Sequence, residues 1–234
     1  MKTKFGAIVV DGRGKLGGHV ASKNRAGSYF RTKVTPVNQQ TSFQLEVRNR
    51  FTGISQAWRG IAQTARDAWN AAVSDYARTD IFGDLKNPTG FNLYQYLNNN
   101  LSICGVAAIT TPPLPEAVGV IVAESLTAED ATEAETLSLV LSAAVPADTY
   151  GKVYATAPQS AGISFVKSEY RLIEVLEPEA ITPVDLLASY QAKFGSTGQA
   201  GQKIFVKVEA VNGTSGQNGT PSQVSAIVTV SAAA

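Results

Sequence analysis

A glycine-rich hexapeptide near the start of the chain has the spacing of a dinucleotide-binding motif. Residues 12–17 read Gly-Arg-Gly-Lys-Leu-Gly and follow a short apolar run typical of a strand. Such a motif binds pyrophosphate when its third glycine opens a helix and an acidic residue about 20 positions later holds the ribose. Strand-like residues follow Gly17 instead, and no Asp or Glu occurs between Asp11 and Glu46. The motif therefore predicts a glycine turn between strands.

The same region is rich in cationic side chains, and it contains the adjacent aromatic residues Tyr29 and Phe30. Cations interleaved with aromatic rings can follow phosphates and stack on bases, but they can equally contact a neighbouring subunit. No known nucleic-acid-binding module accompanies the cluster. We expect contact with sister subunits and keep nucleic acid as the alternative partner. The candidate interaction residues are Arg13, Lys15, Lys23, Arg25, Tyr29, Arg31 and Lys33.

Residues for catalysis or metal binding are sparse. His19 is the only histidine and lies in a glycine-rich turn, whereas nucleophilic and zinc chemistry needs a histidine with oriented partners. Cys104, the only cysteine, ends an apolar helix-like run and is predicted to be a small buried residue. The acidic residues of 124–135 lack the spacing of a calcium loop. We expect no catalytic residue, no bound metal and no cofactor, and therefore a protein that is not an enzyme.

Charge is divided unequally along the chain. Residues 1–100 hold 14 Lys or Arg against 6 Asp or Glu, and residues 101–234 hold 6 against 13. The first part therefore favours an anionic partner, and the second part does not. No apolar run has the length of a membrane span, and the N-terminus lacks the pattern of a secretory signal, so we expect folding in a cytoplasm.

The first 109 residues predict an α+β domain of short glycine-rich strands followed by helices. Strands are expected at 7–10, 17–22 and 28–35. Thr41 with Gln44 three residues later has the pattern of a capping box, and Gly53 predicts a bend or break in the helix that follows. Further helices are expected at 60–77 and 91–102, with Trp58 and Trp69 in their packed core and Gly105 as the stop.

The rest of the chain predicts a linker and an all-β domain. Residues 110–117 contain closely spaced prolines and are expected to form a semi-rigid spacer. Residues 118–234 alternate with period two, which is typical of an immunoglobulin-like β-sandwich. The segment 185–193 is compatible with a short helix or another strand. Strands are expected at 119–126, 136–143, 150–156, 170–175, 204–211 and 223–230.

Two resemblances extend this interpretation. Residues 203–212, a Gly/Ser loop and residues 221–230 resemble the last hairpin of a fibronectin type III domain, although the early-strand tryptophan of that family is absent. Within the first 100 residues, a set of short segments is similar to a group of uncharacterised proteins encoded among the virion structural genes of tailed bacteriophages. Those segments are residues 14–19, 24–29, 31–38, 44–48, Trp58 and 66–69.

The second resemblance implies a virion component that is localised in the particle. We therefore expect a structural protein of the head surface, neck or tail that acts by protein–protein assembly with sister subunits and other virion proteins. The basic N-terminal domain would attach it, and the spacer would project the acidic sandwich. Two alternatives stay open: a nucleic-acid-binding protein that uses the basic strands, and a self-assembling filament subunit of a cell surface.

Overall fold

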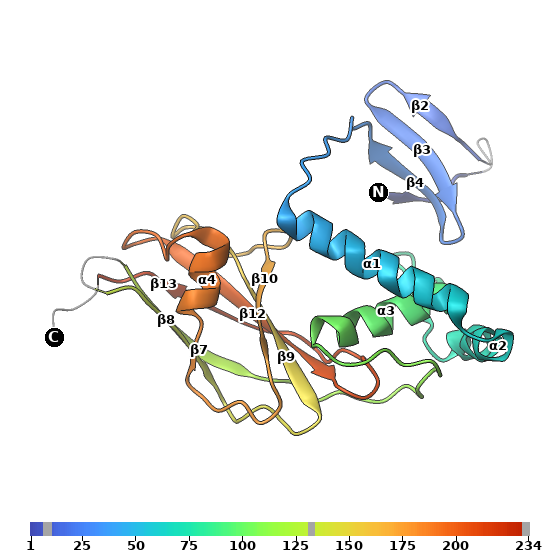
Figure 1. The fold of residues 1–234 in the computed structure, drawn as a ribbon. Helices are drawn as coiled ribbons and strands as arrows, with labels where there is room; N and C mark the ends of the chain where they lie inside the picture. Colours follow the sequence, from blue (N-terminus) through green and yellow to red (C-terminus); the bar gives the residue numbers. More distant parts are fainter. Residues whose placement is uncertain (7–10, 131–133, 231–234) are drawn as a thin grey trace.

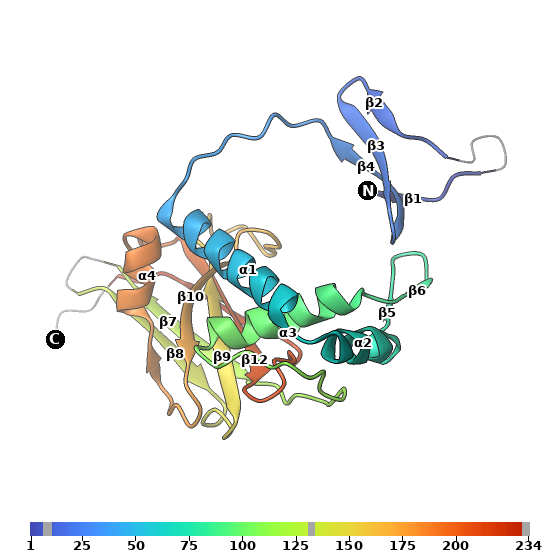
Figure 2. The same cartoon turned by 45° about the vertical axis from the view of Figure 1, so that its right-hand side comes forward.

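The structure is a computed structural model, and it describes residues 1–6, 11–130 and 134–230. The chain forms a small N-terminal sheet, a group of helices, and a larger unit of two antiparallel sheets (Figures 1 and 2). It is thus a mixed fold of helices and antiparallel sheets, as the amphipathic and alternating segments of the sequence predict. The predicted strand at 7–10 lies outside the described residues.

The N-terminal sheet is antiparallel, with the strand order β1-β4-β3-β2. Gly17, with φ of 56°, occupies the turn between β2 and β3, where a side chain would be strained. Because strand β3 follows this turn, and not a helix, the prediction of a glycine turn is confirmed. The bounds are β1 (Lys2–Thr3), β2 (Gly14–Leu16), β3 (His19–Asn24) and β4 (Gly27–Thr32).

Three helices follow an extended segment. The N–H of Gln44 donates to Thr41 Oγ1 at 3.3 Å, which confirms the predicted N-cap. The predicted break at Gly53 is wrong, because helix α1 runs through this residue, whereas the alternative of a bend stays a prediction. The next helix, predicted at 60–77, begins at Gln63, because Ile61 is extended with ψ of 151°. The bounds are α1 (Ser42–Gly60), α2 (Gln63–Ala71), the 3-10 turn η1 (Ala72–Ser74) and α3 (Gly90–Ile103).

The helices pack around two tryptophans, as predicted. Trp69 is fully buried, its ring centroid is 5.3 Å from that of Tyr94, and Tyr94 in turn lies 5.2 Å from Trp58. A short hairpin between α2 and α3, formed by β5 (Arg78–Thr79) and β6 (Leu85–Lys86), was not predicted. Asp80 stabilises its turn, because Oδ1 accepts the N–H groups of Phe82 and Asp84.

In the second half, all six predicted strands are present, with small shifts at their ends. Two sheets form, with the orders β10-β9-β12-β13 and β11-β8-β7. The undecided segment contains both a short strand and helix α4, so the second half is not all-β as expected. The bounds are β7 (Ala123–Glu129), β8 (Thr136–Leu141), β9 (Thr149–Ala155), β10 (Arg171–Leu176), β11 (Val184–Asp185), α4 (Leu187–Phe194), β12 (Lys203–Asn212) and β13 (Ser222–Ile227).

One hydrophobic core joins the two sheets. Leu139 of β8 and Val206 of β12 are fully buried in it, and so is Tyr190 of α4. The Tyr190 hydroxyl donates to the carbonyl of Thr156 at 2.9 Å, so its polar end is satisfied inside the core. The helix occurs in this position because its aromatic side chain fills space beside the strands.

The proline-containing segment 110–117 has no helix or strand and is held from both sides. Trp69 Nε1 donates to the Thr110 carbonyl at 2.7 Å, and the Tyr76 hydroxyl donates to the Pro113 carbonyl at 2.9 Å. On the other side, Gln217 Nε2 donates to the Leu114 carbonyl at 2.7 Å. These contacts pack the segment against the helices on one side and the second half on the other. Its assignment as a linker between two domains stays a prediction.

Helix α3 also contacts the second half directly. Asn100 Nδ2 donates to the Gly216 carbonyl at 2.8 Å, and Gly216 lies so close that an added Cβ would be 2.4 Å from the Leu97 carbonyl oxygen. Lys152, which is only 2% exposed, lies at the same junction. Its Nζ is 2.9 Å from Glu209 Oε2 and 3.1 Å from Asn100 Oδ1. The ion pair links the neighbouring strands β9 and β12, and Asn100 joins helix α3 to them through its hydrogen bonds with Lys152 and Gly216.

Candidate assembly interface

The register of the N-terminal sheet decides which candidate residues share a face. Lys15 pairs with Val20, and Val20 pairs with Arg31, so these three side chains lie in one row across β2, β3 and β4. Tyr29 pairs with Lys2 and belongs to the same face. Directly opposed residues of an antiparallel pair lie on one side of the sheet. We call Lys2, Lys15, Tyr29 and Arg31 the basic face.

The other candidate residues lie elsewhere. Lys23 is on the opposite side of the sheet, and its Nζ is 3.3 Å from Asp11 Oδ2. This hydrogen bond lowers the pKa of Asp11 below its ordinary value. Arg13 is 4.0 Å from the same carboxylate, Arg25 occupies the turn between β3 and β4, and Lys33 follows β4. The structure thus brings Lys15, Tyr29 and Arg31 together on one face, and it brings Lys23 and Arg13 to the carboxylate of Asp11.

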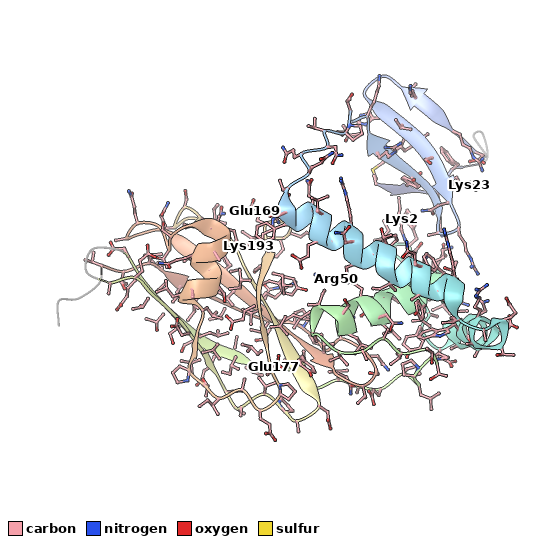
Figure 3. The ribbon with its side chains drawn as sticks, viewed as in Figure 1. Lys2, Lys23, Arg50, Glu169, Glu177 and Lys193 are labelled. Atoms are coloured by element: carbon pink, nitrogen blue, oxygen red, sulfur yellow. The ribbon has the colours of Figure 1, made fainter. Side chains whose placement is uncertain are left out.

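Positive charge is concentrated in this part of the chain. Residues 1–41 contain eight Lys or Arg and one Asp, whereas residues 42–234 contain 12 Lys or Arg and 18 Asp or Glu. Figure 3 shows Lys2 and Lys23 on the sheet, apart from Glu169 and Glu177 of the second half. The sheet and the remainder of the molecule therefore carry net charges of opposite sign.

The described residues of the N-terminal sheet form no core of their own. Among residues 1–6 and 11–41 no side chain is buried, and Leu16 on β2 is 71% exposed. The rings of Phe5 and Phe30 touch edge to face, with centroids 6.2 Å apart. Small sheets need a packed apolar face for independent stability. In the described part of the chain, this sheet has regular strand pairing, but no second layer covers it.

Few contacts attach the sheet to the rest of the chain. Residues 33–41 are exposed and contain no helix or strand, and they form the long blue trace that enters α1 (Figure 2). Two ion pairs reach the β5–β6 hairpin: Lys2 Nζ is 3.7 Å from Asp80 Oδ2, and Lys4 Nζ is 3.0 Å from Asp84 Oδ2. Burial alone would raise the pKa of Asp80, but the Phe82 and Asp84 N–H groups and the nearby lysines lower it. Such partly exposed pairs are weak and salt-sensitive.

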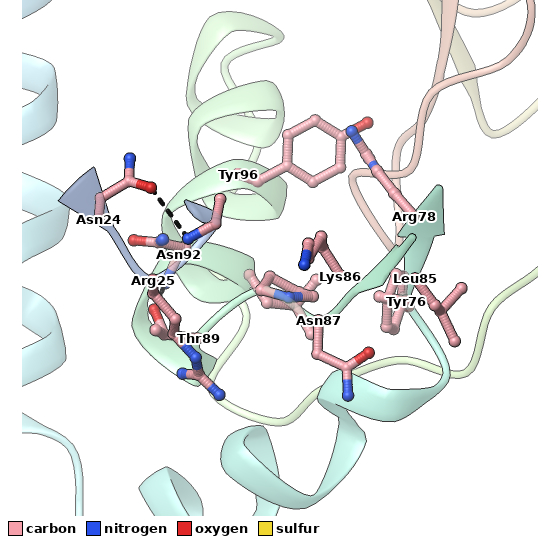
Figure 4. Close-up of a pocket in the computed structure, with 13 residues that line it drawn as sticks. Asn24, Arg25, Tyr76, Arg78, Leu85, Lys86, Asn87, Thr89, Asn92 and Tyr96 are labelled. Carbon is pink, nitrogen blue, oxygen red and sulfur yellow. Dashed lines mark hydrogen bonds between the residues drawn. The ribbon is translucent and has the colours of Figure 1, made fainter. Parts of the chain in front are cut away.

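A cavity of about 780 Å³ lies where the sheet meets the helices (Figure 4). It is lined by the β3–β4 turn, the β5–β6 hairpin and the first turn of α3. Three of its lining residues are cations: Arg25, Arg78 and Lys86. Sequence reasoning missed Arg78 and Lys86, because the two-residue strands that carry them are too short to leave a pattern. The signal that could have found them is Asp80 with Gly83, a turn pattern inside a polar segment.

The remaining candidates do not form a reactive site among the described residues. His19 is exposed on the sheet, opposite Thr32. Burial raises the pKa of the Cys104 thiol to about 11, so the thiol stays protonated at neutral pH. No group of three or more His, Cys, Asp or Glu that could hold a metal occurs within residues 1–6, 11–130 and 134–230.

In the described part of the chain, no helix combines the length and the apolar composition needed to cross a membrane. Comparison of the chain with protein-family models, with curated proteins and with solved structures finds no match. Function is therefore inferred from the chain's own residues and their arrangement.

Proposed function

We propose that this protein is a non-catalytic structural component of a tailed-phage virion, and that it assembles through its N-terminal sheet. The observation that carries this proposal is the sheet itself: it is strongly basic, has no buried side chain among its described residues, and is attached by an exposed tether. A sheet of this kind gains buried area only by docking on another surface. Attachment to a partner supplies the second layer that the described residues do not.

The partner is a protein surface with an excess of carboxylates, and a sister subunit offers one. Residues 42–234 carry more Asp and Glu than Lys and Arg, so the basic face of one copy is complementary to the remainder of another. Complementary charge steers association and selects the partner, while burial of Val20 and Tyr29, which lie on the same face, adds affinity. Other virion proteins with acidic surfaces fit the same description.

The assignment to a virion is supported by the resemblance of segments in residues 14–69 to phage virion proteins. That resemblance covers the sheet, the tether and the first two helices, which are the parts proposed to assemble. A location on the head surface, at the neck or in the tail is compatible with this arrangement.

We further propose that the second half is an immunoglobulin-like sandwich related to fibronectin type III domains. In chain order, its first, second and fifth strands form one sheet, and its third, fourth, sixth and seventh form the other. This division agrees with immunoglobulin-type sandwiches, where strands A, B and E are separated from C, F and G. Helix α4 would then be an insertion between the fifth and sixth strands. The sandwich is the part that would project from the particle.

The test is the size of the full-length protein in solution. Light scattering after size-exclusion chromatography, with electron microscopy of the same fractions, should show rings, tubes or a defined oligomer at low salt. Smaller species are expected at about 0.5 M salt, because screening shortens the reach of exposed charges to a few ångströms. Arg31→Glu should shift the protein toward monomer, and Lys167→Glu, which reverses an exposed cation of the second half, should not.

A monomer at every concentration and salt would end the proposal of self-assembly. Equal loss of assembly in the two charge-reversal variants would show that the basic face is not the contact. Long unbranched fibres would favour the cell-surface filament in place of the virion component.

Nucleic acid is the second candidate partner, because Tyr29 shares the basic face with Lys15 and Arg31. A ring beside two cations can stack on a base while the cations contact phosphates. Fluorescence anisotropy with a labelled single-stranded oligonucleotide would detect this activity. The affinity should fall steeply with salt, and Arg31→Glu should abolish it, if the face binds nucleic acid.

A further inference from the structure

The cavity between the sheet and the helices has an unusual lining. Its three cations come from two separated parts of the chain: Arg25 from the β3–β4 turn, and Arg78 and Lys86 from the β5–β6 hairpin. Figure 4 shows Arg25 on one side of the cavity and Arg78 and Lys86 on the other. None of the residues that line it is Asp or Glu. A hollow with three cations and no lining carboxylate is electrostatically suited to an anion.

Two of the cations are positioned by neighbouring side chains. The Arg78 guanidinium lies 4.9 Å from the centroid of the Tyr96 ring, which orients it against the wall of the cavity. Lys86 Nζ is 3.8 Å from Asp84 Oδ2, a separation too long for a strong hydrogen bond. Lys86 therefore keeps donors for a ligand.

The uncharged lining suits a polar ligand as well. Asn87, Thr89 and Asn92 contribute amide and hydroxyl groups, and Tyr76 and Tyr96 contribute aromatic surface. The volume of about 780 Å³ is within the range of small-molecule sites. A single carboxylate would neutralise one of the three cations, whereas a polyphosphate carries several negative charges and a nucleic-acid backbone carries one at each successive phosphate.

We propose that this cavity binds a ligand that bears phosphate groups, either a free polyphosphate or the backbone of a single-stranded nucleic acid. Arg25, Arg78 and Lys86 would contact the phosphate oxygens. Because these residues belong to the sheet and to the helical part, the bound anion bridges the two parts and holds the tethered sheet in one orientation. This binding site is distinct from the assembly contact, because none of the four basic-face residues lines the cavity.

The experiment is a calorimetric titration of the full-length protein with sodium tripolyphosphate at about 0.15 M salt, where diffuse surface charge is screened beyond about 8 Å. The cavity variant is Arg78→Gln with Lys86→Gln, and the control is Arg59→Gln with Lys167→Gln, which removes the same charge at two exposed positions outside the cavity and off the basic face. The single variant Arg25→Gln, on the exposed β3–β4 turn, tests the site again without changing the β5–β6 hairpin. Circular dichroism establishes that each variant is folded.

Saturable binding is expected for the unmodified protein, with affinity reduced about tenfold or more in the cavity variant, because charge-assisted contacts to phosphate are lost. Arg25→Gln should also weaken binding, and the control should stay within about twofold, since its charges are screened. The absence of saturable binding, or equal weakening in the cavity variant and the control, would overturn the proposal.

A second titration distinguishes the two sources of phosphate. An unlabelled oligothymidylate is added to the tripolyphosphate complex. If the oligothymidylate displaces tripolyphosphate from the unmodified protein, and this displacement is lost in the cavity variant, a nucleic-acid backbone is a ligand of the site. Retention of tripolyphosphate identifies the free anion as the ligand, and either result supports phosphate recognition by this cavity.

Discussion

The molecule contains two four-stranded antiparallel sheets, and they differ in what covers them. In the C-terminal sheet, β12 has Ile204, Val206 and Val208 fully buried on one face. In the N-terminal sheet, β4 has no buried residue, although its hydrogen-bond register with β3 is regular from end to end. Strand pairing is therefore well formed in both sheets, but among the described residues buried ones are found only in the C-terminal sheet.

The difference shows that strand pairing, with side chains pointing alternately to the two faces, is not enough to stabilise a sheet. The C-terminal sheet has a partner layer, β11-β8-β7 with helix α4, whose side chains enter the same core. The described part of the N-terminal region has no such layer, and it has the highest density of positive charge in the chain. Folding free energy comes mainly from apolar burial, so the N-terminal sheet depends on contacts outside itself.

The largest contrast should appear when the same substitution is made in both sheets. Leu139→Ala removes a fully buried side chain and should lower the free energy of unfolding by about 2–5 kcal/mol, because a cavity is left. Leu16→Ala removes a side chain that is 71% exposed and should change it by less than about 0.5 kcal/mol. Urea denaturation followed by far-ultraviolet circular dichroism, which reports on the strands of both sheets, measures both. Equal losses would show that the N-terminal sheet contributes to a common core.

Thiol reactivity tests whether the helices stay packed on the two sheets of the second half. Burial raises the pKa of Cys104 from 9.0 to about 11, so its reaction with an aromatic disulfide at pH 8 should be about a hundredfold slower than in the urea-unfolded chain. As pH rises from 9, the unfolded chain loses the thiol proton first, so the free energy of unfolding should fall toward pH 11. Rapid reaction in the folded protein would show that the junction opens.

The buried ion pair at the junction should have the next effect. Lys152→Ala leaves Glu209 without its cation, and we expect the free energy of unfolding to fall by about 2 kcal/mol. Replacing both partners by apolar residues, in Lys152→Met with Glu209→Leu, should recover part of that loss, because no uncompensated charge remains although Asn100 Oδ1 loses its donor. Thermal unfolding of the three proteins provides the comparison. A double variant as unstable as the single one would contradict this explanation.

The smallest effect on stability is expected on the basic face. Arg31→Glu reverses an exposed charge in a sheet without a core, so the unfolding free energy of the monomer should change by less than about 0.5 kcal/mol. Its effect should appear in assembly instead. A large loss of monomer stability in this variant would show that Arg31 is part of the folded framework.

Local patterns predicted most of the elements. The Thr41 cap, the helices around Trp58 and Trp69, and the six strands of the second half all follow from turn chemistry and the periodicity of apolar residues. Gly53 was misjudged, because α1 continues through it, with the buried Ile54 next to it packed in the helical core. Helix α4 was undecided, because Tyr190 could be assigned to a helix or a strand until the core around it was known.

The candidate site was predicted only in part. Sequence alone determined that the N-terminal segment is basic and strand-forming, because charge and alternation are local properties. Register decided that Lys15, Tyr29 and Arg31 share a face while Lys23 does not. Tertiary structure alone brought Arg25 together with Arg78 and Lys86, and paired Lys152 with Glu209. Contacts between residues far apart in sequence depend on how the packed layers orient their elements, and no local pattern encodes that orientation.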